Sequence, residues 1–364
     1  MDKKSQDKIF MERALELSLL ALGRTSPNPL VGCVIVRNEH IVGEGYHAKA
    51  GTPHAEVKAL KAAGNEAKGS DVYVTLEPCS HHGRTPPCAD ALILAGVKRV
   101  VVAMMDPNPL VSGQGIKKLK EAGITVEIGI LAEKAMKINE FFIKAITKKL
   151  PFILYKSALT LDGKTAVESG DSKWITSEGA RHYVHGLRNI YDTIMVGSNT
   201  VIKDNPLLTC RNIEGGRDPV KIIIDGRLSI PLDAQVITNS SSHCILVTTK
   251  AANHEKVELL KGKENIEIWQ YNTDRYVPLT NLMEDIATRG WHSVLLEGGG
   301  TLAGKMLRKK LIDKIEFIFA PKIAGSGPSP LSGLSFSKMD EVIGVNNVQI
   351  SELDGNYKVS GYVN

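Results

Sequence analysis

Aromatic residues are scarce in this sequence, and apolar residues never form a long run. Phe, Trp and Tyr make up 5% of the 364 residues, which is little for a surface that stacks the bases of a nucleic acid. No apolar run approaches the roughly 18 residues that a membrane-spanning helix needs. The charged start, Met1 to Phe10, is unlike a secretory signal. We therefore expect a cytoplasmic protein that binds neither nucleic acid nor a membrane.

Net charge and cysteine content are also modest. Lys and Arg number 45 against 40 Asp and Glu, a net charge of +5, which suits an anionic small molecule better than a nucleic acid. The five cysteines are an odd number without a disulfide-type pattern, so in a reducing compartment they are thiols, metal ligands or core residues. These features favour a phosphorylated small-molecule substrate over a polymer.

The sequence does contain enough apolar residues for two domains. Its 364 residues exceed one average domain of roughly 100 to 200 residues. Apolar runs typical of strands alternate with helical periodicity in each half, which predicts an α/β layered fold for both. We place the boundary at Lys148–Pro151, giving domains 1–147 and 148–364.

The first half opens with an amphipathic pattern and then a hairpin pattern. We expect the hairpin turn at Asn38-Glu39-His40. A helix should start at Thr52-Pro53, because threonine is a good N-cap and proline suits the first helical position. The other expected elements are helices at Ile9–Leu22, Cys88–Ala95, Gly115–Ala122 and Leu131–Thr147, and strands at Val31–Arg37, Ile41–Tyr46, Val72–Leu76, Val100–Ala103 and Ile124–Ile128.

The second half repeats the alternation and contains a glycine turn, Gly298–Gly300. A strand, a glycine turn and a helix in this order can cradle a phosphate, although such a turn also serves simply to reverse the chain. The expected strands are Phe152–Ala158, Thr193–Gly197, Val220–Asp225, Cys244–Thr248 and Ser293–Leu296, and the expected helices are Leu279–Arg289 and Thr301–Lys309.

His54, Cys79 and Cys88 form the strongest chemical pattern. Zinc favours imidazole and thiolate donors, and three protein ligands with an open fourth position mark a catalytic site. Both cysteines follow a proline at an expected helix start, where the helix dipole stabilises a thiolate. The pattern therefore predicts a catalytic zinc site rather than a buried histidine and two inert thiols.

Glu56 follows His54 by two positions and is expected to act as a proton shuttle. Zinc activates water, and a carboxylate that is not a ligand can carry the proton to a departing amine. Deamination of an amidine-type ring carbon would yield a carbonyl and ammonia. Cys33, Cys210 and Cys244 are expected to be structural thiols, because no partner spacing recruits them.

These motifs resemble the bifunctional riboflavin-biosynthesis family, which joins a diaminohydroxyphosphoribosylaminopyrimidine deaminase to an aminouracil-phosphoribosyl reductase. The long segment 80–87 between the two cysteines matches this family rather than the general zinc-deaminase signature. The matching segments are Thr25–Gly32, His54–Glu56, Glu77–His81 and Thr85–Cys88. The resemblance implies a cytidine-deaminase-like α/β/α zinc domain. It also implies that Asn28, His47, His81 and Arg84 bind the substrate, with Arg84 at a position where the family often has lysine.

The second half resembles the reductase of the same family, which implies a dihydrofolate-reductase-like α/β domain. Its reaction is hydride transfer from NADPH to the open-chain aldehyde of a phosphoribosyl group. The matching segments are Lys156–Lys164, Trp174–Thr176, Val196–Thr200, Asp204–Thr209 and Glu297–Gly300. The resemblance places Lys156, Ser172, Arg188, Leu208, Arg211 and Glu297 on the substrate, and Ala158, Trp174, Thr200, Asp204, Gly299, Gly300, Thr301, Leu302, Ala303, Gly304 and Lys305 on NADPH.

Several of these residues also have simpler interpretations. Asp162-Gly163 is a strong turn signal by itself, Asp204–Pro206 makes a good turn, and Trp174 could be a core residue. Lys156 could polarise the aldehyde oxygen or bind phosphate. The segment after about Pro328 carries no recognisable motif.

Two other functions use part of the same pattern. A nucleic-acid base deaminase shares the His-Glu-Cys-Cys chemistry but needs a basic, aromatic-bearing face. A non-catalytic zinc protein would need a fourth ligand, for which His81 and His82 are the nearest candidates. We expect instead a bifunctional enzyme that uses Zn²⁺ and NADPH, acts on small phosphorylated pyrimidines and forms a homo-oligomer.

Overall fold

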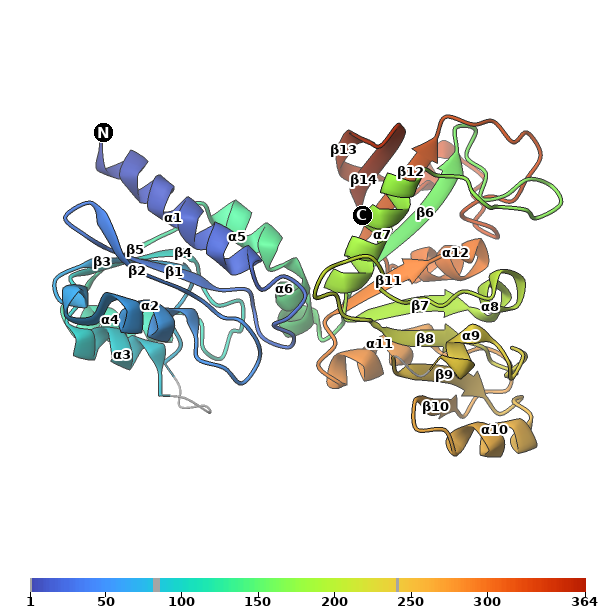
Figure 1. Cartoon of the computed structure of the whole chain (residues 1–364), viewed down its shortest axis with the longest axis horizontal. Helices are drawn as coiled ribbons and strands as arrows, with labels where there is room; N and C mark the ends of the chain where they lie inside the picture. The colour runs from blue at the N-terminus through green and yellow to red at the C-terminus, as the bar shows by residue number, and fades with distance from the viewer. Residues whose placement is uncertain (1, 81–85, 240–241) are drawn as a thin grey trace. The chain divides into compact units, whose positions relative to one another are not determined.

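The computed structural model describes residues 2–80, 86–239 and 242–364. The chain divides into two compact units, Met1–Leu150 and Pro151–Asn364 (Figure 1). Helix α6 (Glu140–Lys148) crosses the boundary expected between residues 147 and 148. Within the described residues, no helix is long and apolar enough to cross a membrane.

The first unit is built on a mixed sheet with the strand order β2-β1-β3-β4-β5. Strand β1 pairs antiparallel with β2 and β3, and β3, β4 and β5 are parallel. The β1–β2 turn has positive φ at Asn38 and Glu39, so the expected hairpin is confirmed. The strands are β1 (Gly32–Arg37), β2 (His40–Tyr46), β3 (Asp71–Leu76), β4 (Arg99–Met104) and β5 (Thr125–Ile128).

Helices cover both faces of this sheet. Figure 1 shows α1 and α5 on one face and α2, α3 and α4 on the other. The cover is tight, because a Cβ on Gly32 of β1 would lie 1.9 Å from the Ala14 carbonyl oxygen of α1. The helices are α1 (Lys3–Leu19), α2 (Ala55–Ala63), α3 (Cys88–Ala95), α4 (Gln114–Glu121), α5 (Ala132–Ile138) and α6, with a 3₁₀ turn at Gly64–Ala67.

Two expected helices differ from those observed. The N-cap of α2 is His54 rather than Thr52, whose hydroxyl instead donates to the Lys49 carbonyl oxygen. The single helix expected over Leu131–Thr147 is two helices that meet at Asn139. The Asn139 side chain accepts from the backbone N–H of Leu30 at 2.8 Å and donates to its carbonyl oxygen at 3.0 Å. This side chain therefore anchors the helix junction to the loop before β1.

The second unit is built on a larger sheet with the strand order β10-β9-β8-β7-β11-β6-β12-β14-β13. The strands from β10 to β12 are parallel, and β14 and β13 complete one edge in antiparallel pairing. The strands are β6 (Phe152–Thr160), β7 (Thr193–Gly197), β8 (Val220–Ile224), β9 (Cys244–Thr249), β10 (Ile266–Tyr271), β11 (Ser293–Glu297), β12 (Lys314–Ala320), β13 (Val345–Leu353) and β14 (Asn356–Val363).

The helices of the second unit include several with no expected counterpart. Helix α7 packs on β12 through Ala180, Val184 and Ile318. The glycine turn has positive φ at Gly298 and Gly299 and leads directly into α12, as expected. The helices are α7 (Glu178–Ile190), α8 (Ser198–Asp204), α9 (Gln235–Thr238), α10 (His254–Lys261), α11 (Leu279–Thr288) and α12 (Gly300–Arg308), with a 3₁₀ turn at Met339–Glu341.

Candidate active sites

The first unit brings His54, Cys79 and Cys88 together in the geometry of a metal site. One donor atom from each lies within 4.8 Å of the others. The His54 Nδ1 atom is 3.2 Å from the Cys88 sulfur and 3.7 Å from the Cys79 sulfur. Tetrahedral zinc with bonds of about 2.0 to 2.3 Å holds its ligand atoms roughly 3.3 to 3.8 Å apart. The three donors therefore fit one zinc ion.

Local structure explains how these donors meet. His54 is the N-cap of α2, and Cys88 is the first residue of α3, as expected. Cys79 differs from expectation: it lies in the loop after β3 rather than at a helix start. Its sulfur accepts the backbone N–H of Cys88 at 3.3 Å. That contact places the start of α3 against the sulfur of Cys79.

The electrostatics of the cluster favour a thiolate. Hydrogen bonds from Cys88 and His54 lower the pKa of the Cys79 thiol to about 4, although burial opposes this change. The hydrogen bond to Cys79 raises the pKa of the His54 ring. A thiolate beside imidazole is the soft donor set that zinc prefers.

Glu56 lies in the first turn of α2 and is 3% exposed. Burial raises the pKa of its carboxyl to about 7. A carboxyl with a pKa near neutrality can both accept and release a proton under physiological conditions.

A cavity of about 560 Å³ opens beside these residues. Asn28 and His47 line it together with His54 and Glu56. The Asn28 side-chain amide lies 3.0 Å from His47 Nε2, and His47 Nδ1 lies 3.4 Å from the Pro53 carbonyl oxygen. Burial lowers the pKa of His47. The contacts fit a neutral ring whose Nε2 accepts from Asn28 and whose Nδ1 donates to Pro53.

The cavity wall also includes residues that the sequence did not identify. Asp106 and Asn108 lie on the loop after β4, and Phe142 and Ile146 lie on α6. The position of Asp106 directly after an apolar strand was the one available signal, since polar residues at the carboxyl ends of strands commonly line sites. The expected substrate-binding residues His81 and Arg84, and His82, lie outside the described residues.

The second unit places Glu297, Arg188 and Lys156 together. Arg188 donates to both Glu297 carboxylate oxygens, at 2.7 and 3.0 Å, and Lys156 Nζ lies 4.0 Å from the same group. Burial raises the pKa of Glu297, but the charges of Arg188 and Lys156 outweigh it and hold that pKa at about 2. Burial lowers the pKa of Lys156. A carboxylate and two cations thus share one polar site.

A pocket of about 330 Å³ adjoins this cluster. Trp174 and Arg211 line it as well. Trp174 is 63% exposed, and its ring lies 4.6 Å from the Arg181 guanidinium, so its interpretation as a core residue is wrong. The pocket also contains His185, which the sequence did not identify. Its Nδ1 lies 3.2 Å from the backbone N–H nitrogen of Arg211.

The residues expected on NADPH lie around the glycine turn. The Thr200 hydroxyl would be 3.3 Å from a Cβ on Gly298, so α8 and the turn are in contact. A Cβ on Gly300 would meet the Ser329 carbonyl oxygen at 2.7 Å, and Ala303 is fully buried. The segment after Pro328 therefore packs on α12.

The other expected residues are spread along neighbouring segments. Ala158 lies two residues beyond Lys156, on the same face of β6. Leu208 is 3% exposed, with a positive φ of 55°. Asp204 is the last residue of α8, and Ser172 lies in the loop before α7. The remaining residues expected on NADPH belong to the turn and α12: Gly299, Thr301, Leu302, Gly304 and Lys305.

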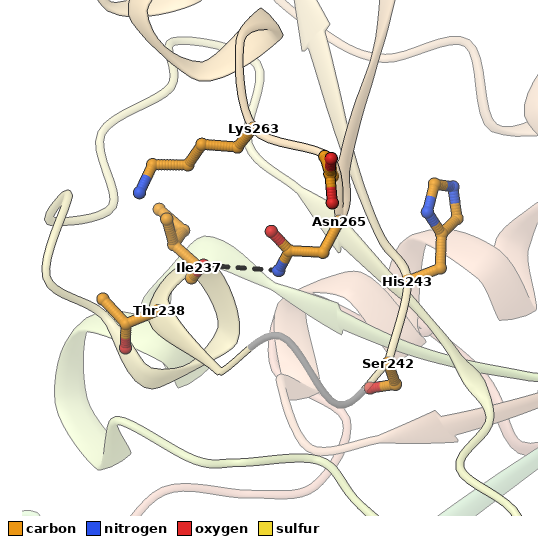
Figure 2. Close-up of a pocket in the computed structure, with 7 residues that line it drawn as sticks. Ile237, Thr238, Ser242, His243, Lys263 and Asn265 are labelled. Carbon is orange, nitrogen blue, oxygen red and sulfur yellow. Dashed lines mark hydrogen bonds between the residues drawn. The ribbon is translucent and has the colours of Figure 1, made fainter.

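A second hollow of the same unit, about 570 Å³, lies at the amino ends of β9 and β10 (Figure 2). Ser242 and His243 precede β9, and Asn265 precedes β10 and donates to the Ile237 carbonyl oxygen at 3.4 Å. Open α/β sheets bind their ligands at the carboxyl ends of the strands. This hollow lies at the opposite, amino ends of the strands, so we assign it to neither reaction.

Comparisons with known proteins agree with the family expected for each half of the chain. Residues 4–104 match the cytidine and deoxycytidylate deaminase zinc-binding region, and residues 151–358 match the RibD C-terminal domain. The riboflavin biosynthesis protein RibD of Aquifex aeolicus is 44% identical over 349 residues, which cover 95% of this chain and 96% of the relative. The RibD protein of Synechocystis is 40% identical over 359 residues, which cover 98% of this chain and 96% of the relative.

Solved structures give the same result. RibD of Acinetobacter baumannii superimposes with a TM-score of 0.89 at 38% identity, and both chains are covered completely. The diaminohydroxyphosphoribosylaminopyrimidine deaminase/5-amino-6-(5-phosphoribosylamino)uracil reductase of Thermotoga maritima superimposes with a TM-score of 0.86. Its sequence identity is 37%, and both chains are again covered completely. This chain therefore belongs to the RibD family of riboflavin biosynthesis and is an enzyme with both a zinc-dependent deaminase and an NADPH-dependent reductase activity.

Proposed function

We propose that Met1–Leu150 deaminates 2,5-diamino-6-(5-phosphoribosylamino)pyrimidin-4(3H)-one and that Pro151–Asn364 reduces the resulting 5-amino-6-(5-phosphoribosylamino)uracil. The observation that carries the proposal is the cluster of His54, Cys79 and Cys88 with Glu56 at a cavity of about 560 Å³. A cavity of this size accommodates a small phosphorylated pyrimidine.

In the deaminase site, His54, Cys79 and Cys88 would hold zinc. When bound, zinc would activate water for attack on the ring carbon that carries the amine. Glu56 takes up the proton of that water and returns it to the departing amine, because its carboxyl is buried beside the ligands and has a pKa near neutrality. Asn28 and His47, which line the same cavity, orient the pyrimidine.

In the reductase site, NADPH would supply a hydride to the aldehyde carbon of the ribosyl chain. Lys156 donates a hydrogen bond to the aldehyde oxygen, because burial beside Glu297 holds its Nζ in place. Arg188 is already bonded to Glu297 and to the Thr209 carbonyl oxygen, so it fixes the carboxylate. Arg211 is exposed and is the better candidate for the substrate phosphate.

The test is incubation of the full chain with the diaminopyrimidine ribosyl phosphate, with and without NADPH. Ammonia release should need no NADPH, whereas NADPH absorbance should fall only after ammonia has appeared. NADPH oxidation without prior ammonia release would contradict the order of the two steps. No ammonia release by the zinc-loaded chain would contradict the deaminase assignment.

Two further properties are part of the proposal. We place the enzyme in the cytoplasm, because a reducing compartment keeps zinc-binding thiols free and supplies NADPH. We also propose that it forms a homo-oligomer and uses no nucleic acid or membrane as a partner. Light scattering of the purified chain checks the oligomeric state, since a monomer mass at working concentration would contradict a homo-oligomer.

A further inference from the structure

Glu77 is a buried carboxylate that the mechanism above leaves without a role. It lies between the end of β3 and the ligand Cys79 and is 5% exposed. Its oxygens accept hydrogen bonds from four backbone N–H groups, those of Asp106, Gly113, Gly115 and Ile116, at 3.2, 2.9, 3.0 and 3.3 Å. Four charge-assisted hydrogen bonds to one buried side chain form a strong attachment.

The four donors lie in a single segment, residues 106–116, which runs from the loop after β4 into the first turn of α4. Asp106, Asn108 and Val111 of this segment line the deaminase cavity. Contacts within the segment close its turns: the Asn108 backbone N–H donates to the Asp106 side chain at 2.8 Å, and the Ser112 N–H donates to the Asn108 carbonyl oxygen at 2.9 Å. Glu77 holds both ends of the segment at once.

Close packing strengthens the attachment beside Glu77. A Cβ on Gly115 would lie 1.9 Å from the Pro78 carbonyl oxygen, so the start of α4 lies directly against the backbone that precedes Cys79. The sequence Glu77-Pro78-Cys79 therefore carries a loop anchor, a close packing contact and a metal ligand in consecutive residues. The hydrogen bonds of Glu77 go to the cavity wall and not to the neighbouring metal ligand.

We propose that Glu77 is a positioning residue of the deaminase, which fixes the segment 106–116 as the cavity wall and so sets substrate binding. The proposal rests on the assignment of this cavity to the pyrimidine substrate. A carboxylate accepts hydrogen bonds on both oxygens, whereas a glutamine offers one acceptor oxygen and would turn its NH₂ group toward other N–H donors. Glu77→Gln is therefore nearly isosteric, yet it breaks part of the attachment.

The experiment compares the full chain with Glu77→Gln and with the control Glu44→Gln. Glu44 is half-buried in the same unit and pairs with Arg13 at 2.7 Å, away from the cavity lining. For Glu77→Gln we expect a KM for the diaminopyrimidine ribosyl phosphate at least tenfold higher and a smaller change in kcat. Zinc content and reductase rate should match the parent chain, and Glu44→Gln should leave all four quantities near the parent values.

Hydrogen exchange supplies a readout that does not depend on turnover. Amides in a peptide covering residues 105–117 should exchange at least tenfold faster in Glu77→Gln than in the parent or the control. Unchanged exchange would overturn the proposal, and so would loss of zinc, because Glu77 would then support the ligand rather than the wall. A wild-type chain that releases no ammonia would contradict the proposed function, while the exchange result would still decide whether Glu77 anchors the segment.

If Glu77→Gln does not fold, a second measurement tests whether the segment 106–116 is the cavity wall that binds the substrate. Adding the same pyrimidine to full-length Glu56→Gln, which should bind but not deaminate it, should slow exchange in residues 105–117. Slower exchange there would support a wall fixed against the substrate. Unchanged exchange there, with protection found elsewhere in the first unit, would overturn the proposal.

Discussion

Cys79 and Cys88 have different surroundings although one ion is expected to bind both. Cys88 is fully buried at the start of α3, whereas Cys79 is half-buried and accepts the Cys88 N–H. Since three ligands and an open position suffice for catalysis, loss of either sulfur should leave too few donors. We predict that Cys79→Ser and Cys88→Ser both lose zinc and ammonia release but keep reductase activity. Metal analysis per chain is the measurement, and full occupancy in the double variant would rule out these ligands.

Glu56 provides a second residue-scale prediction. Glu56→Gln should keep zinc, since it is not among the three clustered donors, yet an amide cannot take up and return a proton. General acid–base groups contribute about 10²- to 10⁴-fold, so ammonia release should fall by at least that lower factor. The exposed Glu66→Gln serves as the control. A near-normal rate in Glu56→Gln would place the proton shuttle elsewhere.

Lys221 gives a prediction about stability. It is fully buried on β8, in register with Cys244 of β9. Among the residues that the structure describes, its Nζ has no hydrogen-bond partner. Burial lowers the pKa of Lys221 in the folded chain, so the unfolded chain binds more protons. Stability should therefore rise as pH increases from the lowered pKa of the folded chain toward the unfolded pKa of about 10.4.

We expect Lys221→Met to raise the urea midpoint of the second unit at pH 7 and to remove this part of the pH dependence. Lys250→Met, at an exposed lysine, should do neither. A midpoint lowered by Lys221→Met would mean that the ammonium has a stabilising partner.

Single functional residues could be predicted from the sequence where only a few residue types can perform the chemistry. His54, Glu56, Cys79 and Cys88 were identifiable because few residue types bind zinc or move protons. Phe142 was not, because an apolar residue on a helix has no chemical signature, and its place in the cavity depends on how α6 packs.

At the scale of elements, the contact between α1 and β1 depends on a glycine. A Cβ on Gly32 would lie 1.9 Å from the Ala14 carbonyl oxygen and 2.9 Å from the Ser18 nitrogen, so Gly32→Ala must push the helix from the sheet. Overpacking typically costs about 1 to 3 kcal/mol, and we expect at least this loss in the first unit, measured by urea unfolding. Gly186 of α7 has open space around its Cβ position. Gly186→Ala should instead stabilise by roughly 0.5 to 1 kcal/mol. Equal effects of the two changes would contradict the packing argument.

The central strands could be predicted from sequence because they are buried on both faces and therefore appear as continuous apolar runs. Strand β13 could not, because most of its residues are exposed and the strand is held by pairing with β14. The break between α5 and α6 was also missed. It depends on the bond between Asn139 and Leu30, which are far apart in the sequence.

At the scale of the whole molecule, the described residues that line each candidate site all belong to one unit. The main apolar core of the first unit is drawn from residues between Met11 and Ala135. Helix α6 contributes Phe142 and Ile146 to the deaminase cavity, so a cut at residue 147 would end the chain inside a helix that the site uses. The polar site of the second unit is formed by Lys156, Arg188 and Glu297, all from Pro151–Asn364.

We therefore predict that fragments Met1–Leu150 and Pro151–Asn364 fold separately. The first should bind zinc and release ammonia without NADPH, and the second should oxidise NADPH with the deaminated substrate while binding no zinc.

In the second fragment, Glu297→Ala should raise the apparent KM for substrate more than that for NADPH. Removing this carboxylate leaves Lys156 and Arg188 without their anion, and the substrate is the ligand assigned to that pocket. An effect confined to NADPH would place Glu297 on the cofactor side, and a folded fragment without activity would show that the two units complete one another's sites.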